Sequence, residues 1–135
     1  MNSALAVVGS VFLVVAALVH VGIFVLESVL WRRPSTWRRF GVHDQRDADA
    51  LQPMAYNQGF YNLFLAVGAG IGLMLLSTAP SAEAGIAIAI FALASMLLAA
   101  IVLVASNPRM LRPALVQGAA PALALLFLVL SLVVG

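Results

Sequence analysis

The order of apolar and polar positions divides the chain into four long apolar segments and three polar connections. The apolar segments cover residues 4–30, 55–78, 85–106 and 114–134. Each is long enough to cross the hydrocarbon core of a membrane, which takes about 20 residues of α-helix. Short connections make consecutive helices antiparallel neighbours. The pattern predicts a single all-α domain, an integral membrane four-helix bundle with up-down-up-down topology.

The polar connections predict how this bundle is oriented. Residues 31–53 and 107–113 hold all seven arginines, whereas residues 79–84 and both chain ends hold none. Short cytoplasmic loops of membrane proteins are enriched in arginine and lysine, and this bias sets the orientation. We expect 31–53 and 107–113 to be cytoplasmic loops and 79–84 an outer loop, with both termini outside. The first apolar segment exceeds the ~7–15 residues of a signal peptide, so we expect a retained helix.

Composition supports the membrane assignment and excludes several kinds of site. Hydrophobic residues make up 64% of the chain and charged residues 9%, against roughly a quarter charged in soluble domains. A water-soluble core of this length could not bury so much apolar surface. The arginines are too few and too scattered for a nucleic-acid surface, so no nucleic-acid partner is expected. With no cysteine, disulfides, thiolate metal sites and cysteine nucleophiles are excluded.

The first apolar segment contains the most informative polar residues. Glu27 lies about one turn before the arginines, and a carboxylate inside a membrane segment is costly and often functional. His20 lies seven positions earlier, and Phe24 and Trp31 complete spacings of three, four and seven. On a continuous α-helix these four side chains share one face.

Further polar side chains are predicted at the same depth. The second segment begins Tyr-Asn-Gln-Gly-Phe-Tyr-Asn, in which Gln58, Tyr61 and Asn62 share a helical face. Gln117 lies about one turn inside the fourth segment. All strongly polar side chains of the apolar segments thus fall in the predicted cytoplasmic half, which predicts one polar site there.

Three interpretations of this polar cluster remain open. The cluster forms a ligand pocket with aromatic walls, or its members only hydrogen-bond across packed helices, or it holds a metal ion. His20 and Glu27 are too far apart on one helix to ligate a metal without further ligands, and no zinc motif is present. We therefore predict no metal site and no cofactor. No catalytic motif identifies a nucleophile, so the catalytic residues are unknown and enzymatic activity is undecided.

Two other features have both a functional and a structural interpretation. The arginine-rich connection, with Trp37 and Phe40, either grips anionic lipid headgroups or only anchors the topology. Gly68 and Gly72 form a G-x-x-x-G pair that lets helix backbones approach closely.

The residues of the first two segments resemble a known family. His20, Phe24, Glu27 and Trp31, followed by the string Asn-Gln-Gly-Phe-Tyr-Asn at 57–62, resemble a family of small bacterial membrane proteins catalogued as a domain of unknown function. The resemblance covers most of the chain and implies a four-helix membrane protein. We expect it in the bacterial cytoplasmic (inner) membrane. It carries no established activity.

The sequence therefore favours a multi-pass protein that binds or transports a small ligand or lipid in a cytoplasm-facing pocket. The alternatives are a small membrane enzyme acting on a lipid-soluble substrate, and a structural protein whose polar cluster only packs helices. Membrane lipid and a small molecule are the expected partners, and a transporter of this size would be a homodimer or larger. The predicted ligand-binding residues are His20, Glu27, Trp31, Gln58, Tyr61, Asn62 and Gln117.

Overall fold

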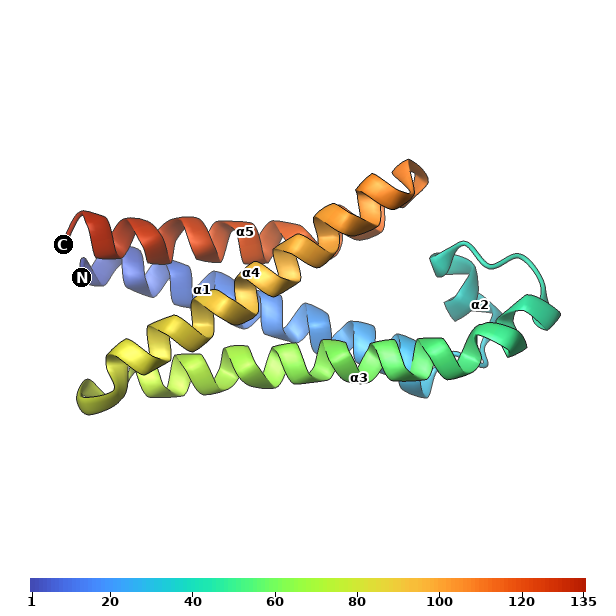
Figure 1. Ribbon diagram of the computed structural model, residues 1–135, viewed down its shortest axis with the longest axis horizontal. Helices are drawn as coiled ribbons and strands as arrows, with labels where there is room; N and C mark the ends of the chain where they lie inside the picture. Colours follow the sequence, from blue (N-terminus) through green and yellow to red (C-terminus); the bar gives the residue numbers. More distant parts are fainter. The chain divides into compact units, whose positions relative to one another are not determined.

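A computed structural model describes residues 1–135, apart from the side chain of Ala79. Every regular element in the described chain is helical. In chain order the elements are α1 (Ser3–Phe24), the π-helical turn η1 (Val25–Val29), α2 (Pro34–Trp37), η2 (Arg38–Phe40), α3 (Gln45–Leu76), η3 (Ala79–Ser81), α4 (Ala82–Ser106), η4 (Pro108–Met110) and α5 (Leu111–Val133). Figure 1 shows them coloured along the chain.

Four of the described helical stretches are long and apolar enough to span a membrane. They are Ser3–Val29, Gln45–Leu76, Ala82–Ser106 and Pro108–Val133. The prediction of an all-α membrane protein with four spanning helices is confirmed. The chain divides into two compact units, one made of Met1–Val19 and Leu65–Gly135 and the other of His20–Phe64.

The first unit is a four-helix bundle built from the start of α1, the end of α3, α4 and α5. Small alanines dominate its core, which also contains Leu13, Leu93, Met96 and Leu128. The amide of Asn2 donates to the carbonyl oxygen of Ser131 over 2.7 Å, so the two chain ends meet at one end of this bundle. Because alanine side chains are small, the helix backbones approach closely and are held together by van der Waals packing, as is usual for helices surrounded by lipid.

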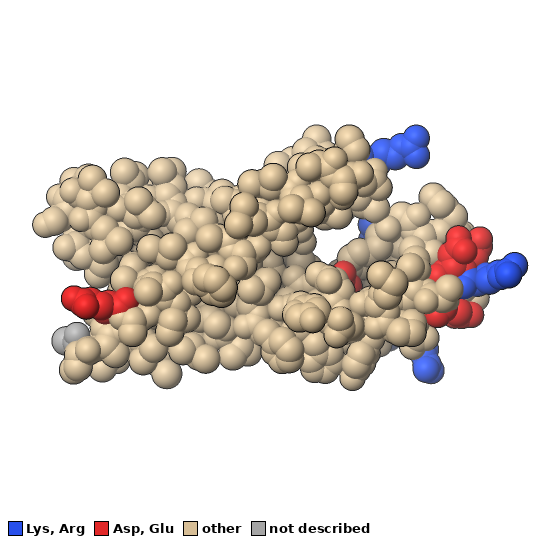
Figure 2. Space-filling model, in the orientation of Figure 1, with Lys and Arg blue, Asp and Glu red and all other residues tan. Residues whose placement is uncertain are grey.

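The predicted close approach of small residues is found between α3 and α4. A Cβ atom added to Gly72 would lie 2.7 Å from the backbone nitrogen of Ala89, whereas one added to Gly68 would lie 3.8 Å from the Cβ of Ala92. The bundle therefore depends on a glycine at position 72 more than at position 68. In Figure 2 the flanks of this bundle show no charged side chain on the visible face, and the charges lie toward its ends.

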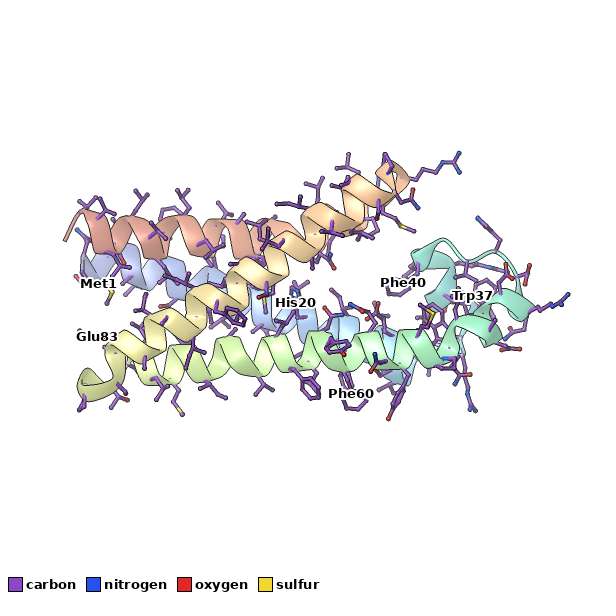
Figure 3. All side chains as sticks on the ribbon, in the orientation of Figure 1. Met1, His20, Trp37, Phe40, Phe60 and Glu83 are labelled. Carbon is purple, nitrogen blue, oxygen red and sulfur yellow. The ribbon has the colours of Figure 1, made fainter. Side chains whose placement is uncertain are left out.

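The second unit is a helical hairpin whose connection is folded. The end of α1 and the turn η1 run against the beginning of α3, and α2 and η2 lie in the chain between them. Trp31, Trp37, Val42, Ala48 and Ala55 form a small apolar core, against which Phe40 packs. Figure 3 labels Trp37 and Phe40 on the two short helices. The arginine-rich connection is thus a packed structure rather than an open loop.

The beginning of α3 differs from the expected boundary near residue 55. The helix begins at Gln45 and runs through Pro53. The side chain of Asp44 accepts a hydrogen bond from the amide of Asp47 over 2.8 Å, which satisfies one of the free N–H groups at a helix start. The side chains of Gln45 and Asp49 add an i, i+4 hydrogen bond of 2.8 Å. The stretch of mixed charge from Asp44 to Asp49, whose composition is typical of a solvated loop, therefore caps and begins a long helix.

Candidate functional site

A π-helical turn determines where Glu27 projects. Over Val25–Val29 the backbone leaves the α-helical pattern, and the amide of Leu30 bonds to the carbonyl of Val25 over 2.9 Å. A π-turn has more residues per turn than an α-helix and often occurs at functional sites. Residues after Phe24 are therefore rotated relative to His20. The single straight face expected from His20 to Trp31 is interrupted, and Trp31 lies beyond the end of the helix.

Glu27 is buried and hydrogen-bonded to a residue of α3. Its exposed fraction is 8%, and that of Asn62 is 7%. The side-chain Nδ2 of Asn62 donates to Oε2 of Glu27 and to the backbone carbonyl of Gln58, both over 3.0 Å. The amide of Asn62 is thereby held between its own helix and the carboxyl group. The carboxyl partner is an amide and not one of the nearby arginines.

Gly59 allows the two backbones to approach closely beside this bond. A Cβ atom at position 59 would collide with Oγ of Ser28 and lie 3.1 Å from the Cβ of Glu27. The hydroxyl of Ser28 donates to the backbone carbonyl of Tyr56 over 2.8 Å. The buried or half-buried positions Ala48, Gln52, Ala55, Gly59 and Asn62 recur at alternating spacings of three and four. This face of α3 packs closely against the η1 region because most residues on the face are small.

A cleft of ≈350 Å³ opens next to this contact. Its lining residues are Glu27, Ser28, Val29, Trp31, Arg32, Gln52 and Tyr56. The volume is at the lower end of the ~300–1,000 Å³ typical of small-molecule sites. The first spanning stretch ends at Val29, so the lining runs from the last turn of the span to the first arginine beyond it.

The aromatic wall formed by Trp31 is held in place by two contacts. Its indole nitrogen donates to the carbonyl of Ala48 over 2.8 Å, and its ring centroid lies 5.5 Å from that of Phe40. The residue is 6% exposed. The ring is therefore fixed within the folded hairpin.

The structure brings together some of the predicted site residues. Glu27 and Asn62 are bonded, and Trp31 lines the same cleft as Glu27. Gln58 contributes its backbone carbonyl, while its side chain is exposed. Tyr61 is 56% exposed and is not among the lining residues.

The other two predicted site residues lie elsewhere in the chain. His20 is buried at 1% exposure and has an interaction of its own within the chain, so it is not a free side chain. It is not among the residues that line the cleft. Gln117 belongs to α5, in the other compact unit.

Five lining residues were not predicted as site residues. They are Ser28, Val29, Arg32, Gln52 and Tyr56. Gln52 and Tyr56 are four residues apart on one helical face, but this relation is visible only once α3 is known to begin at Gln45. The N-cap pattern at Asp44 was the signal that could have revealed it.

Aromatic rings cover the outer side of the hairpin near this cleft. The ring of Phe60 lies 5.0 Å from Tyr56, 6.1 Å from Phe64 and 5.1 Å from Phe24, measured between centroids. Figure 3 shows Phe60 projecting from α3. Tyr56 and Phe64 are more than half exposed, and exposed rings are typical of a helix that faces lipid near a membrane boundary.

Comparison with known proteins identifies the family. A family model described as "Protein of unknown function (DUF1304)" matches residues 14–129. The chain belongs to this family. The resemblance seen in the first two segments is confirmed at the level of a family of unknown function, and the match runs from within the first spanning stretch to within the fourth. Comparison with curated proteins and with solved structures gives no match.

The lining residues of the cleft differ in the chemical groups that they present. It offers a carboxyl group, a guanidinium, a hydroxyl, an amide and two aromatic rings from Trp31 and Tyr56. Among the described residues, no group of three or more His, Asp or Glu side chains is arranged to hold a metal ion.

Proposed function

We propose that this membrane protein binds a small polar ligand in the cleft beside Glu27. The single observation that carries the proposal is the combination of a buried carboxyl group with an adjoining cleft of ≈350 Å³. A packing network alone needs no such space, since interior polar groups normally bond to one another in a filled interior. Here Asn62 occupies Oε2 of Glu27, and the same carboxyl group lines the cleft, so its second oxygen can accept a bond from a ligand.

The position of the cleft supports a ligand that reaches it from the membrane boundary. Lining residues Glu27 and Val29 belong to the first spanning stretch, whereas Trp31 and Arg32 follow its end. By the arginine distribution this boundary is the cytoplasmic one. The ligand would therefore enter from the cytoplasm or from the inner leaflet.

Filling the cleft tests the proposal. The full chain is purified in mild detergent directly from cell membranes and examined by native mass spectrometry. We expect a discrete bound adduct in the wild type that is absent from Gln52→Trp, because the larger side chain would occupy the cleft. The matched control is Gln58→Trp, on the same helix but exposed and outside the lining, which should keep the adduct.

Two outcomes would count against a binding cleft. One is an adduct of the same mass and occupancy in Gln52→Trp and in the wild type, which would locate the ligand elsewhere. The other is the absence of any adduct even when the protein is extracted into nanodiscs together with its native lipids. The packing interpretation of the polar cluster would then be the better one.

A further inference from the structure

The cleft lining carries both signs of charge together with two aromatic rings. Glu27 and Arg32 supply the charges, and Trp31 and Tyr56 supply the rings. We propose that the cleft binds a zwitterionic group in which a primary ammonium is joined to a phosphate, the chemistry of ethanolamine phosphate. This inference rests on the proposed function of the cleft and names the class of its ligand.

The ammonium would be recognised at the Glu27 side of the cleft. Nδ2 of Asn62 bonds to Oε2 over 3.0 Å, which orients the carboxyl group and leaves the other oxygen for a donor. A buried carboxylate is stabilised by a partner of opposite charge, because burying an unpaired charge is costly. A bound ammonium supplies that charge and forms a strong charge-assisted hydrogen bond.

The aromatic rings add a second preference for a cation. The faces of tryptophan and tyrosine rings attract cations through their quadrupole. The indole nitrogen of Trp31 is already bonded to the carbonyl of Ala48, so this residue offers the ligand its ring rather than a donor. A primary ammonium can donate an N–H hydrogen bond to the carboxylate oxygen, whereas a quaternary ammonium has no N–H group to donate. The lining therefore favours ethanolamine over choline.

The phosphate would be recognised at the Arg32 side. Arg32 is exposed, lies three residues past the end of the first spanning stretch and still lines the cleft. A guanidinium presents a planar fork of donors that matches phosphate oxygens. A cleft of ≈350 Å³ suits such a headgroup but not the acyl chains, so the ligand is either a lipid headgroup with its chains in the bilayer or free ethanolamine phosphate.

Defined probes distinguish the ligand class and its source. Full-length protein in mild detergent is titrated with short-chain phosphatidylethanolamine, phosphatidylcholine and phosphatidylglycerol, and separately with soluble ethanolamine phosphate. Occupancy is read by native mass spectrometry. We expect the wild type to prefer phosphatidylethanolamine by about tenfold over the other two lipids, the effect of one charge-assisted hydrogen bond.

Variants assign the two halves of the site. Glu27→Gln should bring the binding of phosphatidylethanolamine and phosphatidylglycerol to within about twofold of each other, while Arg32→Gln should weaken binding of all three lipids about tenfold. The matched controls are Arg33→Gln, its neighbour outside the lining, and Glu83→Gln, an exposed carboxylate in α4. Both controls should bind as the wild type does.

A second variant keeps the inference testable if Glu27→Gln fails to fold. Tyr56→Leu removes a ring but keeps the backbone carbonyl that bonds Ser28, and it should reduce the preference for phosphatidylethanolamine over phosphatidylglycerol about two- to fivefold, the size of an exposed cation–π contact. Tyr61→Leu, an exposed tyrosine outside the lining, is its control.

Each outcome decides the ligand class. Saturable binding of phosphatidylethanolamine without binding of soluble ethanolamine phosphate supports a lipid headgroup, and tighter binding of soluble ethanolamine phosphate than of the lipid supports the free compound. Equal binding of the three lipids by the wild type, or an unchanged preference in both Glu27→Gln and Tyr56→Leu, would overturn the inference. A native adduct that Gln52→Trp removes and that phosphatidylethanolamine does not displace would overturn the ligand class while leaving the binding cleft intact.

Discussion

The close contact at Gly59 makes a quantitative prediction about stability. In Gly59→Ala the new Cβ atom collides with Oγ of Ser28 and lies 3.1 Å from both the Cβ of Glu27 and the backbone nitrogen of Ser28. The serine hydroxyl must rotate away, which breaks its 2.8 Å hydrogen bond to the carbonyl of Tyr56. The remaining two contacts are tight and involve less movable atoms.

The expected free-energy change combines three effects. Loss of the Ser28 hydrogen bond costs about 0.5–1.5 kcal/mol, and the crowding of a packed contact costs about 1–3 kcal/mol. Replacing a helical glycine by alanine returns about 1 kcal/mol through helix propensity. Gly59→Ala should therefore destabilise the protein by about 0.5–3.5 kcal/mol.

Gly70→Ala is the matched control for this substitution. Gly70 lies on the same helix α3, and a Cβ atom added there meets nothing within 4 Å. Only the helix-propensity effect remains, so Gly70→Ala should be neutral or stabilising by up to ~1 kcal/mol. The two variants share the same chemical change and differ only in their surroundings.

Thermal unfolding in detergent micelles, followed by circular dichroism at 222 nm, compares the variants. Gly59→Ala should unfold at a lower temperature than the wild type and Gly70→Ala at the same or a higher one. The double variant Ser28→Ala/Gly59→Ala should recover part of the loss, because it removes the colliding oxygen. Equal stability of Gly59→Ala and Gly70→Ala would refute the close approach of η1 and α3.

Two further predictions concern the bundle and its orientation. Gly72→Leu should disrupt the packing of α3 on α4 and lower the unfolding temperature, because a Cβ atom there already lies 2.7 Å from the backbone nitrogen of Ala89, whereas Gly68→Ala should be tolerated. Since the chain has no cysteine, single cysteines at Ser35 and Ser81 can report topology with a membrane-impermeant maleimide in intact cells. Ser81→Cys should react and Ser35→Cys should not; the opposite pattern would reverse the orientation predicted from the arginines.

Sequence reasoning located the main members of the candidate site but not its full lining. Glu27 stands out because a carboxyl group in an apolar segment is costly, and Asn62 stands out as a polar amide on the same helical face as Gln58 and Tyr61. Which side chains of α3 meet Glu27 depends on the rotation of two helices about their axes. That rotation placed Asn62 beside the carboxyl group and left Tyr61 at 56% exposure.

The sequence by itself determined that the chain crosses a membrane four times. Four apolar segments of sufficient length are separated by polar connections, and hydrophobic length is a local property that needs no tertiary contact to be recognised. The Asp44 cap at the start of α3 was also present in the local sequence, although its mixed charges resemble a loop.

Only the tertiary structure decided how the polar residues are combined. The π-turn at Val25–Val29 rotates Glu27 away from the face expected of a continuous α-helix. Because Gly59 has no side chain, α3 can approach Glu27 closely. The cleft exists because these two backbones meet there, and because Trp31 is fixed by a carbonyl 17 residues further along the chain. Such contacts arise from packing between segments, and a periodic pattern within one segment does not specify them.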